Sequence, residues 1–301
     1  MSLAPPTTAA GKPLPTAPAA DPAAASPPAP RPWRPSRWLQ GSAALHAAAA
    51  VAVAAAPARW PWAAAALAAD HLASAAAGLW PASCLLGPNL SRLPAAAARR
   101  GEVALSFDDG PDPRVTPAVL EQLAGGGVRA SFFCIGRRAE SHPEVVAELA
   151  RRGHRVENHS YSHPYAFSCL PPPALRREVR RAQEILTRAA GRPPRFFRAP
   201  AGLRSWLLER ELAAAGLHLA SWSRRGFDAV SRDPRRIARR LLAGLRAGDV
   251  LLLHDGSAAL DRGGRPVVLE LLPRLLDELA ARGLRAVPLP EAGLGEPEGA
   301  S

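Results

Sequence analysis

The sequence predicts an α/β fold, a parallel sheet or barrel, for residues 98–290 of the 301-residue chain. Short strand-like apolar runs alternate there with amphipathic helical patterns, and repeated strand–helix units are typical of parallel sheets. A second observation is that glycines mark the expected helix ends. These glycines are Gly125 to Gly127, Gly153, Gly191, Gly216, Gly248 and Gly283.

Seven strands and six helices are expected in this region. The strands are placed near Val103–Phe107, Ala130–Ile135, Arg155–Asn158, Arg195–Arg198, Leu217–Trp222, Val250–His254 and Arg285–Val287. The helices are placed near Val115–Ala124, Pro143–Arg152, Ala174–Ala189, Ser205–Ala215, Pro234–Arg246 and Val267–Arg282. Seven strands are one fewer than the eightfold (β/α) barrel contains.

Residues 1–33 are expected to be a disordered leader. They hold ten of the 33 prolines, and most other positions are Ala, Ser or Thr without apolar periodicity. Such a segment cannot bury enough apolar surface to offset the entropy lost on ordering. Residues 291–301 are expected to form a short tail.

Residues 34–97 are expected to form a membrane-anchoring helical hairpin. Trp38–Ala56 carries no formal charge and, at about 20 residues, is long enough to span a bilayer. A second apolar stretch, Trp60–Trp80, is interrupted by Asp70 and His71. A central Asp costs about 2.5–3.5 kcal/mol in a membrane span, whereas tryptophans at the ends of both stretches favour an interface. The alternatives are a soluble Ala-rich helix pair and a signal peptide.

Basic residues flank both outer ends of the apolar stretches, whereas Arg59 is the single basic residue between them. We expect the protein to contact membrane lipid through residues 34–97, at a bacterial inner membrane. Under the positive-inside rule, two spans leave residues 98–290 in the cytoplasm, and one span places them in the periplasm. The sequence leaves both topologies open.

The net charge of +12, from 38 Lys+Arg and 26 Asp+Glu, could indicate a nucleic-acid partner. The arginines are scattered, without a basic helix or interleaved aromatic residues, so no nucleic-acid partner is expected. Cys84, Cys134 and Cys169 form no CxxC or Cys/His pair, which argues against a disulfide framework or a structural zinc knot. The oligomeric state stays unknown.

Acidic, imidazole and guanidinium groups follow four of the predicted strands at their carboxyl ends, where parallel α/β folds place active sites. Asp109, His159 and His163 make a His₂–carboxylate set that leaves one coordination position open, as catalytic metal sites do. Because the two histidines are four residues apart, a helical turn would place them on one face. Asp108 is then free to act as general base on a metal-bound water.

The region from Glu102 to Val287 resembles the polysaccharide deacetylase family, also called NodB-like or carbohydrate esterase family 4. The matching motifs are Ser106-Phe107-Asp108-Asp109-Gly110-Pro111, His159-Ser160-Tyr161-Ser162-His163, Arg198-Ala199-Pro200-Ala201-Gly202 and Leu251 to Asp255. The resemblance implies a distorted (β/α)7 barrel. It also implies a metal-dependent hydrolase that removes N-acetyl groups from amino sugars of a glycan or lipid-linked saccharide.

The resemblance implies a role for each polar group at the strand ends. Asp108 is implied to be the general base, and Arg198 orients it by an ion pair. His254 is implied to protonate the leaving amine, with Asp228 tuning it. The implied ligands of a divalent metal, usually zinc, are Asp109, His159 and His163.

The sequence departs from the family pattern in two places. Ala201 stands where the family often has tyrosine, and its backbone N–H is implied to help hold the oxyanion. The fourth family motif, Asp-x-x-Asp-Trp, is not intact in Trp222 to Asp228. The resemblance implies that Trp222 and Leu252 wall the pocket for the acetate group.

Several alternatives stay open. Taken singly, each motif also has an ordinary structural role, such as a solvated turn for Asp108-Asp109 or a buried core position for His254. Arg224 and Arg225 either favour an anionic substrate, such as a phosphate-linked sugar, or are solvated surface charges. The same machinery would also serve an amidase or deformylase on another small N-acyl substrate. A non-catalytic carbohydrate-binding barrel is the remaining alternative.

Overall fold

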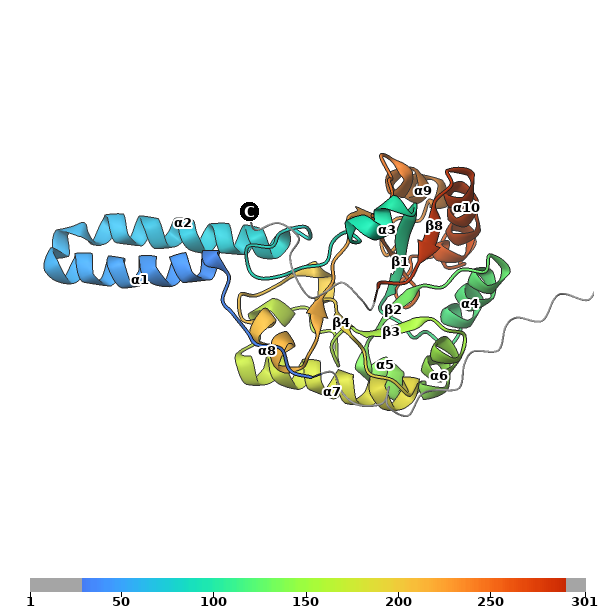
Figure 1. Ribbon diagram of the computed structural model, residues 1–301, viewed down its shortest axis with the longest axis horizontal. Helices are drawn as coiled ribbons and strands as arrows, with labels where there is room; N and C mark the ends of the chain where they lie inside the picture. The colour runs from blue at the N-terminus through green and yellow to red at the C-terminus, as the bar shows by residue number, and fades with distance from the viewer. Residues whose placement is uncertain (1–28, 291–301) are drawn as a thin grey trace, which may run out of the picture.

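Parallel strands form the centre of the structure, a computed structural model that describes residues 29–290 (Figure 1). The strands are β1 (Glu102–Asp108), β2 (Ser131–Cys134), β3 (Arg155–Asn158), β4 (Phe196–Phe197), β5 (His218–Leu219), β6 (Arg224–Arg225), β7 (Val250–His254) and β8 (Arg285–Val287). Their order in the sheet is β5-β4-β3-β2-β1-β7-β6, and β8 pairs with β1. All seven predicted strands are present. The structure has one further strand, β6, which the sequence does not predict because two consecutive arginines give no apolar signal.

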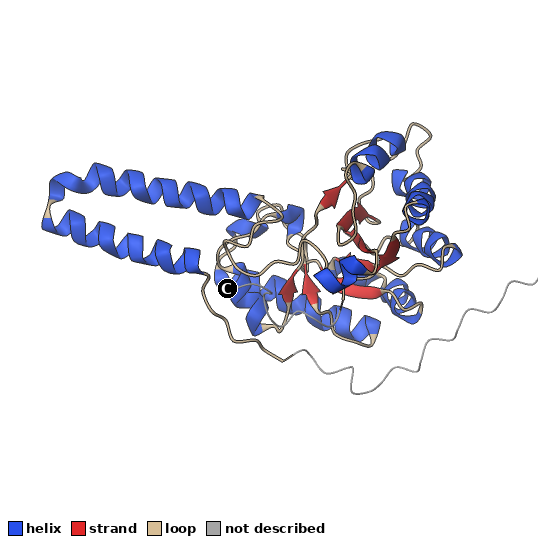
Figure 2. Ribbon diagram, turned by 45° about the horizontal axis from the view of Figure 1, so that its top comes forward, coloured by secondary structure: helices blue, strands red, loops and turns tan. Residues whose placement is uncertain are grey.

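Helices surround the sheet (Figure 2). Those of the α/β part are α3 (Ala95–Arg99), α4 (Val115–Gly125), α5 (Gly136–Ser141), α6 (Pro143–Arg151), α7 (Pro172–Ala190), α8 (Leu208–Ala214), α9 (Pro234–Leu242) and α10 (Val267–Ala281). Short 3-10 turns lie at Pro57–Arg59, Phe167–Cys169 and Pro200–Gly202. Helix α7 shows how the sequence sets the bounds. A proline occupies its first position, and Gly191 ends it in the left-handed conformation.

The sheet is a parallel half-barrel rather than a closed ring. Within residues 29–290 no strand pairing joins β5 to β6. The gap is bridged instead by an irregular segment, in which Leu90 pairs with Ala220 just after β5 and Arg92 pairs with Asp249 just before β7. The expected parallel α/β fold is therefore confirmed, but closure into a seven-stranded barrel is not, because the strands at both edges are only two residues long.

Apolar side chains are buried on both faces of the sheet. In β7, Leu251 and Leu253 belong to the core between the sheet and the outer helices. Val250 and Leu252 point to the opposite face, where they join the cluster that contains Trp222. Burial on both faces explains the continuous apolar runs of the central strands, since each buried Val or Leu side chain contributes about 1.5–3 kcal/mol.

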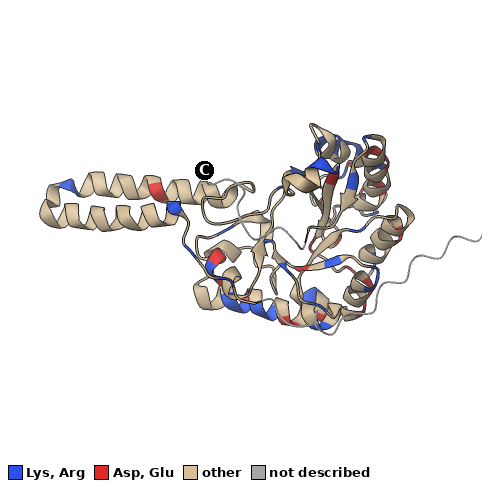
Figure 3. Cartoon of the chain, in the orientation of Figure 1, with Lys and Arg blue, Asp and Glu red and all other residues tan. Residues whose placement is uncertain are grey.

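A hairpin of two long helices, α1 (Arg37–Ala55) and α2 (Trp60–Leu79), projects from the α/β part (Figure 1). The helix bounds agree with the two predicted apolar stretches. The hairpin carries few charged residues, whereas the helices of the α/β part carry many (Figure 3). Of the helices that the structure describes, only α1 is long and apolar enough to cross a membrane. Helix α2, at 20 residues, is also long enough but not apolar enough by this measure, so the predicted pair of spans is not confirmed.

Both ends of the hairpin are fastened to the α/β part. On the N-terminal side, Arg31 forms an ion pair with Glu209 at 3.0 Å. On the C-terminal side, the Arg204 guanidinium donates to the backbone carbonyls of Ala77, Trp80 and Ser83. Residues 80–94, predicted as part of the hairpin, run back across the α/β part instead. Most of the predicted leader (1–28) and the predicted tail (291–301) lie outside the described residues.

Candidate active site

The strand register brings the predicted site residues to one edge of the sheet. Asp108, the last residue of β1, is the direct register partner of His254, the last residue of β7. On the other side, Asn158 of β3 pairs with Phe197 of β4, so His159 and Arg198 both follow at the same level. Neighbouring strands lie about 4.8 Å apart. Sequence segments up to 146 positions apart are therefore adjacent at this edge, since 254 minus 108 is 146.

Asp108 is held by a fully buried arginine. The Arg198 guanidinium donates to Asp108 Oδ1 at 2.5 Å and to Ser106 Oγ at 3.0 Å. It also donates to the backbone carbonyls of Ala220 and Ser221, so every side of the guanidinium has a partner. Burial lowers the pKa of Arg198, and the adjacent Asp108 carboxylate opposes this shift. The ion pair fixes the orientation of Asp108, and removing either partner would leave a buried charge unpaired.

Asp109, His159 and His163 meet in a second cluster beside Asp108. Asp109 Oδ1 lies 3.2 Å from His159 Nε2 and 3.3 Å from His163 Nε2. Asp109 has a φ of 70°, and this left-handed conformation turns its carboxylate to the same site as that of Asp108. His159 Nε2 also lies 3.9 Å from Asp108 Oδ2.

The three side chains fit a divalent metal. Asp109 Oδ1 is buried and receives no hydrogen bond from any described residue. His159 Nδ1 donates to the Arg198 carbonyl at 2.8 Å, which leaves the lone pair of Nε2 directed at the same point. An unpaired buried oxygen and a nitrogen with a fixed tautomer are what a metal ligand requires, and two imidazoles with one carboxylate suit a zinc-like ion.

The loop that carries the two histidines is not the helical turn expected from their spacing. Ser160 and His163 have φ values of 61° and 52°, both in the left-handed region. Glu178 of α7 holds the loop by accepting the backbone N–H groups of Tyr161 and Ser162. Two left-handed residues, rather than helical periodicity, therefore bring the imidazoles together. Their ring centroids lie 4.9 Å apart.

Electrostatic interactions within this cluster favour an ionised Asp109. Burial alone would raise its pKa, but the nearby His159, the charge of His254 and the Ser257 hydroxyl lower it well below its usual range. Burial lowers the pKa of His163, and repulsion from His159 adds to this effect. An ionised carboxylate beside a neutral imidazole is the form that binds a metal ion.

His254 is paired with the buried carboxylate of Asp228. His254 Nδ1 donates to Asp228 Oδ1 at 2.9 Å, and the His254 backbone N–H donates to Asp228 Oδ2 at 2.7 Å. Burial lowers the pKa of His254, but the hydrogen bond and charge of Asp228, with the charges of Asp108 and Asp109, raise it to about 8. His254 is therefore protonated near neutral pH, as a proton donor must be.

The residues expected to contact substrate lie beside these groups. Trp222 and Leu252 belong to one buried cluster on the inner face of the sheet. Gly202 lies so close to Trp222 that a Cβ there would come within 2.4 Å of the ring. Ala201, directly before it, is exposed and has a φ of 54°, which turns the loop sharply at the rim. The substrate contacts expected of Ala201, Trp222 and Leu252 stay predictions.

The two arginines of β6 differ in position. Arg224 donates to Asp249 Oδ2 at 3.0 Å and to the carbonyls of Ala243 and Gly244, which lie away from the site. The Arg225 guanidinium lies 5.4 Å from the Trp222 ring centroid. Arg224 is thus an internal ion-pair partner rather than a residue that favours an anionic substrate, and only Arg225 of this pair lies near Trp222.

Two positioning residues are not among the predicted site residues. Arg138 of α5 donates to the carbonyls of Asp109 and Gly256, at 2.7 Å each, and so joins the loops that follow β1 and β7. Asp255 accepts a hydrogen bond from Thr116 at 2.5 Å, and burial raises its pKa to about 7. Asp255 lies in the Leu-x-x-His-Asp motif, so the sequence contains a signal for it. No local sequence signal identifies Arg138, because the segments that it contacts are far away in the chain.

Comparison with known proteins places this fold and site in a family. The family model for polysaccharide deacetylases matches residues 95–220. A peptidoglycan-N-acetylglucosamine deacetylase of Bacillus cereus is 34% identical over 194 residues, which cover 64% of this chain and 68% of the relative. A chitooligosaccharide deacetylase of Bradyrhizobium sp. is also 34% identical, over 63% of this chain and 89% of the relative.

A solved structure supports the same assignment. The crystal structure of a peptidoglycan N-acetylglucosamine deacetylase, in complex with 4-naphthalen-1-yl-N-oxidanyl-benzamide, superposes with a TM-score of 0.60 at 30% identity. The superposed region covers 67% of this chain and 91% of the solved chain. Fold and site thus define a hydrolase built on a parallel (β/α) half-barrel, one that acts on carbon–nitrogen bonds other than peptide bonds. The chain belongs to the polysaccharide deacetylase family, also known as carbohydrate esterase family 4 or NodB-like.

Proposed function

We propose that this protein hydrolyses the N-acetyl group of N-acetylglucosamine residues in a glycan or lipid-linked saccharide, with a divalent metal. One observation carries the proposal. Asp108, a carboxylate paired with Arg198, and His254, an acid held protonated, are register partners that flank the Asp109–His159–His163 set. The relatives act on peptidoglycan and chitooligosaccharides, which supports an N-acetylated amino sugar as the substrate of this chain.

The side chains divide the proton transfers between them. When bound to Asp109, His159 and His163, a divalent metal such as zinc supplies Lewis-acid polarisation of the acyl carbonyl and acidifies water. Asp108 accepts the proton of the attacking water, because Arg198 binds its Oδ1 and its Oδ2 faces the site beside His159. His254 then donates its proton to the leaving amine.

The surrounding residues confine the acyl group. Trp222 and Leu252 form a dry wall beside the strand ends, where an acetyl methyl would be shielded from water. The turn at Ala201 presents backbone at the rim, so we assign its N–H to the developing oxyanion. Both assignments rest on position and extend the proposed reaction.

The proposal is tested by incubating the zinc-loaded protein with N-acetylglucosamine oligomers and measuring acetate and free amine. Equimolar release of both supports deacetylation. Formate release from N-formyl sugars, without acetate release from N-acetyl sugars, would instead establish the deformylase alternative. Saturable glycan binding with neither product would establish a carbohydrate-binding barrel.

The pH profile is expected to depend on Asp228. Protonated His254 is the donor, so activity should fall as the pH rises through about 8. Replacing Asp228 with Asn removes the carboxylate that raises this pKa. The alkaline limb should then move down toward about 6.5, the ordinary histidine value. Asp233→Asn, which removes a surface carboxylate near α9, is the control and should leave the limb in place. An unmoved limb in Asp228→Asn would contradict the assignment of His254 as the acid.

We further propose that the α1–α2 hairpin associates with a membrane as one unit, with both of its ends on the side of the catalytic domain. Its outward surface supports this, since Val51 and Leu72 are 68% and 72% exposed. Trp60 and Trp62, at the tip of the hairpin, are 63% and 80% exposed. Large apolar side chains on an unpartnered surface are typical of membrane contact.

Charges on this surface are expected to release the protein from membranes. In water, Val51→Lys and Leu72→Lys alter exposed positions and should leave the fold unchanged. In lipid each lysine costs up to about 2.5–3.5 kcal/mol. The double variant should therefore move from the membrane pellet to the soluble fraction, while deacetylating soluble oligomers at an unchanged rate. Val230→Lys, at a 75% exposed position of the catalytic domain, is the matched control. A soluble wild-type protein would contradict the proposal.

A further inference from the structure

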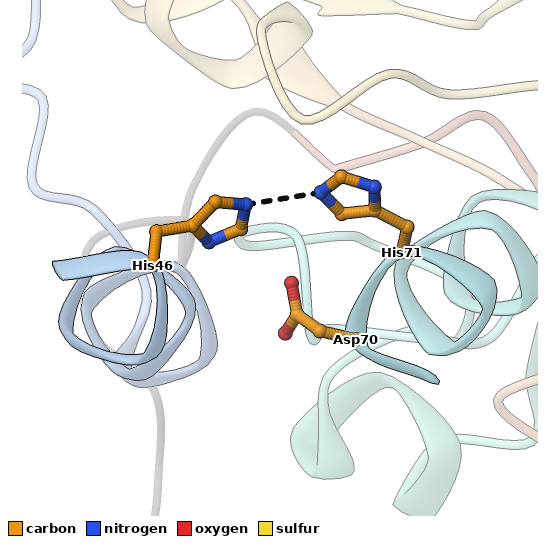
Figure 4. A group of neighbouring side chains, drawn as sticks. All are labelled: His46, Asp70 and His71. Carbon is orange, nitrogen blue, oxygen red and sulfur yellow. Dashed lines mark hydrogen bonds between the residues drawn. The ribbon is translucent and has the colours of Figure 1, made fainter. Parts of the chain in front are cut away.

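A polar cluster lies between the two helices of the hairpin, about halfway along its length (Figure 4). His46 belongs to α1, and Asp70 and His71 belong to α2. Their ligand atoms all lie within 4.8 Å of one another. These three residues, named the hairpin cluster below, interrupt helices that are otherwise dominated by alanine and other apolar residues.

The tautomer of His46 is fixed by a backbone carbonyl. His46 Nδ1 lies 2.8 Å from the carbonyl oxygen of Ser42, and because a carbonyl can only accept, Nδ1 carries the proton. The lone pair of His46 Nε2 then faces His71 Nε2, 3.1 Å away, and the two nitrogens share a hydrogen bond (Figure 4). His159 in the active site is held in the same way by the Arg198 carbonyl. Such a hydrogen bond orients metal-ligating histidines generally.

The carboxylate of the cluster is buried and anchored. Asp70 is 8% exposed, and its Oδ2 accepts the Ser42 hydroxyl at 2.7 Å. Ser42 therefore positions two members of the cluster, Asp70 through its hydroxyl and His46 through its carbonyl. A buried carboxylate in an apolar hairpin is costly unless a positive charge or several donors compensate it.

The cluster opens onto a cavity of about 1160 Å³. All three residues line this cavity, which lies between the hairpin and the loop that follows the Pro200–Gly202 turn. Trp206 belongs to the opposite wall. A metal held by three side chains here would keep an open coordination position toward this space.

We propose that His46, Asp70 and His71 bind a divalent transition-metal ion, at a second site separate from the one in the catalytic domain. Two imidazole nitrogens and one carboxylate select ions such as zinc, cobalt or nickel over magnesium and calcium, which prefer oxygen ligands. The ion compensates the Asp70 charge and joins α1 to α2. A purely structural His46–His71 hydrogen bond is the competing explanation.

The test uses Co²⁺ as the probe, with the full-length chain in detergent. His159→Ala disables the catalytic-domain site, so the remaining Co²⁺ absorption reports on the hairpin. This variant should bind one Co²⁺ with the visible spectrum of a site with nitrogen ligands. Adding His46→Ala should weaken binding by about a hundredfold or more. Ser74→Ala removes a different interhelical hydrogen bond, from Trp38, and should change nothing.

Two further measurements separate a metal site from a structural contact. His71→Cys should keep Co²⁺ binding and add an intense thiolate-to-cobalt band in the near ultraviolet, because a thiolate replaces the imidazole. In the chain with an intact catalytic site, His46→Ala should bind one Co²⁺ instead of two and release acetate at an unchanged rate. Failure of His159→Ala to bind Co²⁺ while the intact chain binds only one, or binding unaffected by His46→Ala, would overturn the proposal.

Discussion

Replacing Asp108 with asparagine is expected to reduce acetate release about a hundred- to ten-thousandfold, which is the contribution of a general base. The isosteric amide can still accept the hydrogen bond from Arg198 but cannot take a proton from water. Metal binding should persist, since Asp108 is not one of the three proposed ligands. The measurement is kcat on N-acetylglucosamine oligomers, together with the zinc content of the purified variant.

The same variant also has a predictable stability cost. Arg198 is 1% exposed and loses its buried counter-charge, so the free energy of unfolding should fall by up to about 3–5 kcal/mol. Activity is therefore compared well below the thermal transition of the variant. Glu148→Gln, which breaks the surface ion pairs of Glu148 with Arg151 and Arg152, is the control and should cost at most about 1 kcal/mol per pair. Wild-type acetate release by folded Asp108→Asn would contradict the base assignment.

Replacing His159 with alanine is expected to remove both the metal of the catalytic domain and the activity. One of three ligands is lost, and the free Asp109 oxygen loses its nearest nitrogen. A Lewis acid contributes several kcal/mol to such a reaction, so we expect a decrease of about a thousandfold or more. Zinc titration and kcat measured on the same samples should fall together.

His154→Ala provides the matched control for this variant. His154 is equally buried and lies at the opposite, amino end of β3, where its Nδ1 accepts from the backbone N–H of Ala130. Its removal should lower stability without changing metal binding. If His159→Ala retained full activity with zinc bound, the proposed ligand set would be wrong.

Local sequence signals were sufficient for the parts of the fold and site that are contiguous in the chain. The apolar run of β1 followed by Asp108-Asp109-Gly110-Pro111 gives a strand, its end and its polar groups within one short segment. The same holds for β7 and His254. Parallel strands align their carboxyl ends, so placing each strand correctly also brings these groups together.

Conformations that depend on distant partners could not be predicted in this way. The loop from His159 to His163 adopts two left-handed residues because Glu178 of α7 binds its backbone, and a four-residue spacing contains no information about that contact. Arg138 likewise acts on two loops that lie 29 and 118 residues away in sequence.

Apolar composition was equally unable to identify what covers an apolar segment. The predicted hairpin, residues 34–97, includes Leu90 and Leu93, but in the structure they close the gap in the half-barrel. Burial in lipid and burial against a protein sheet give the same hydropathy signal. In contrast, Trp60 and Trp62 are exposed at the tip of the hairpin, where the prediction of a membrane interface still stands as a proposal.

The most direct test of the central claim is a zinc titration of metal-free protein, with acetate release from N-acetylglucosamine oligomers as the readout. We predict negligible release without metal, and a rate that rises in proportion to zinc bound at Asp109, His159 and His163. Using the His46→Ala variant confines the titration to that site. Full acetate release by the metal-free protein, or zinc bound at this site without release of any acyl group, would contradict the account.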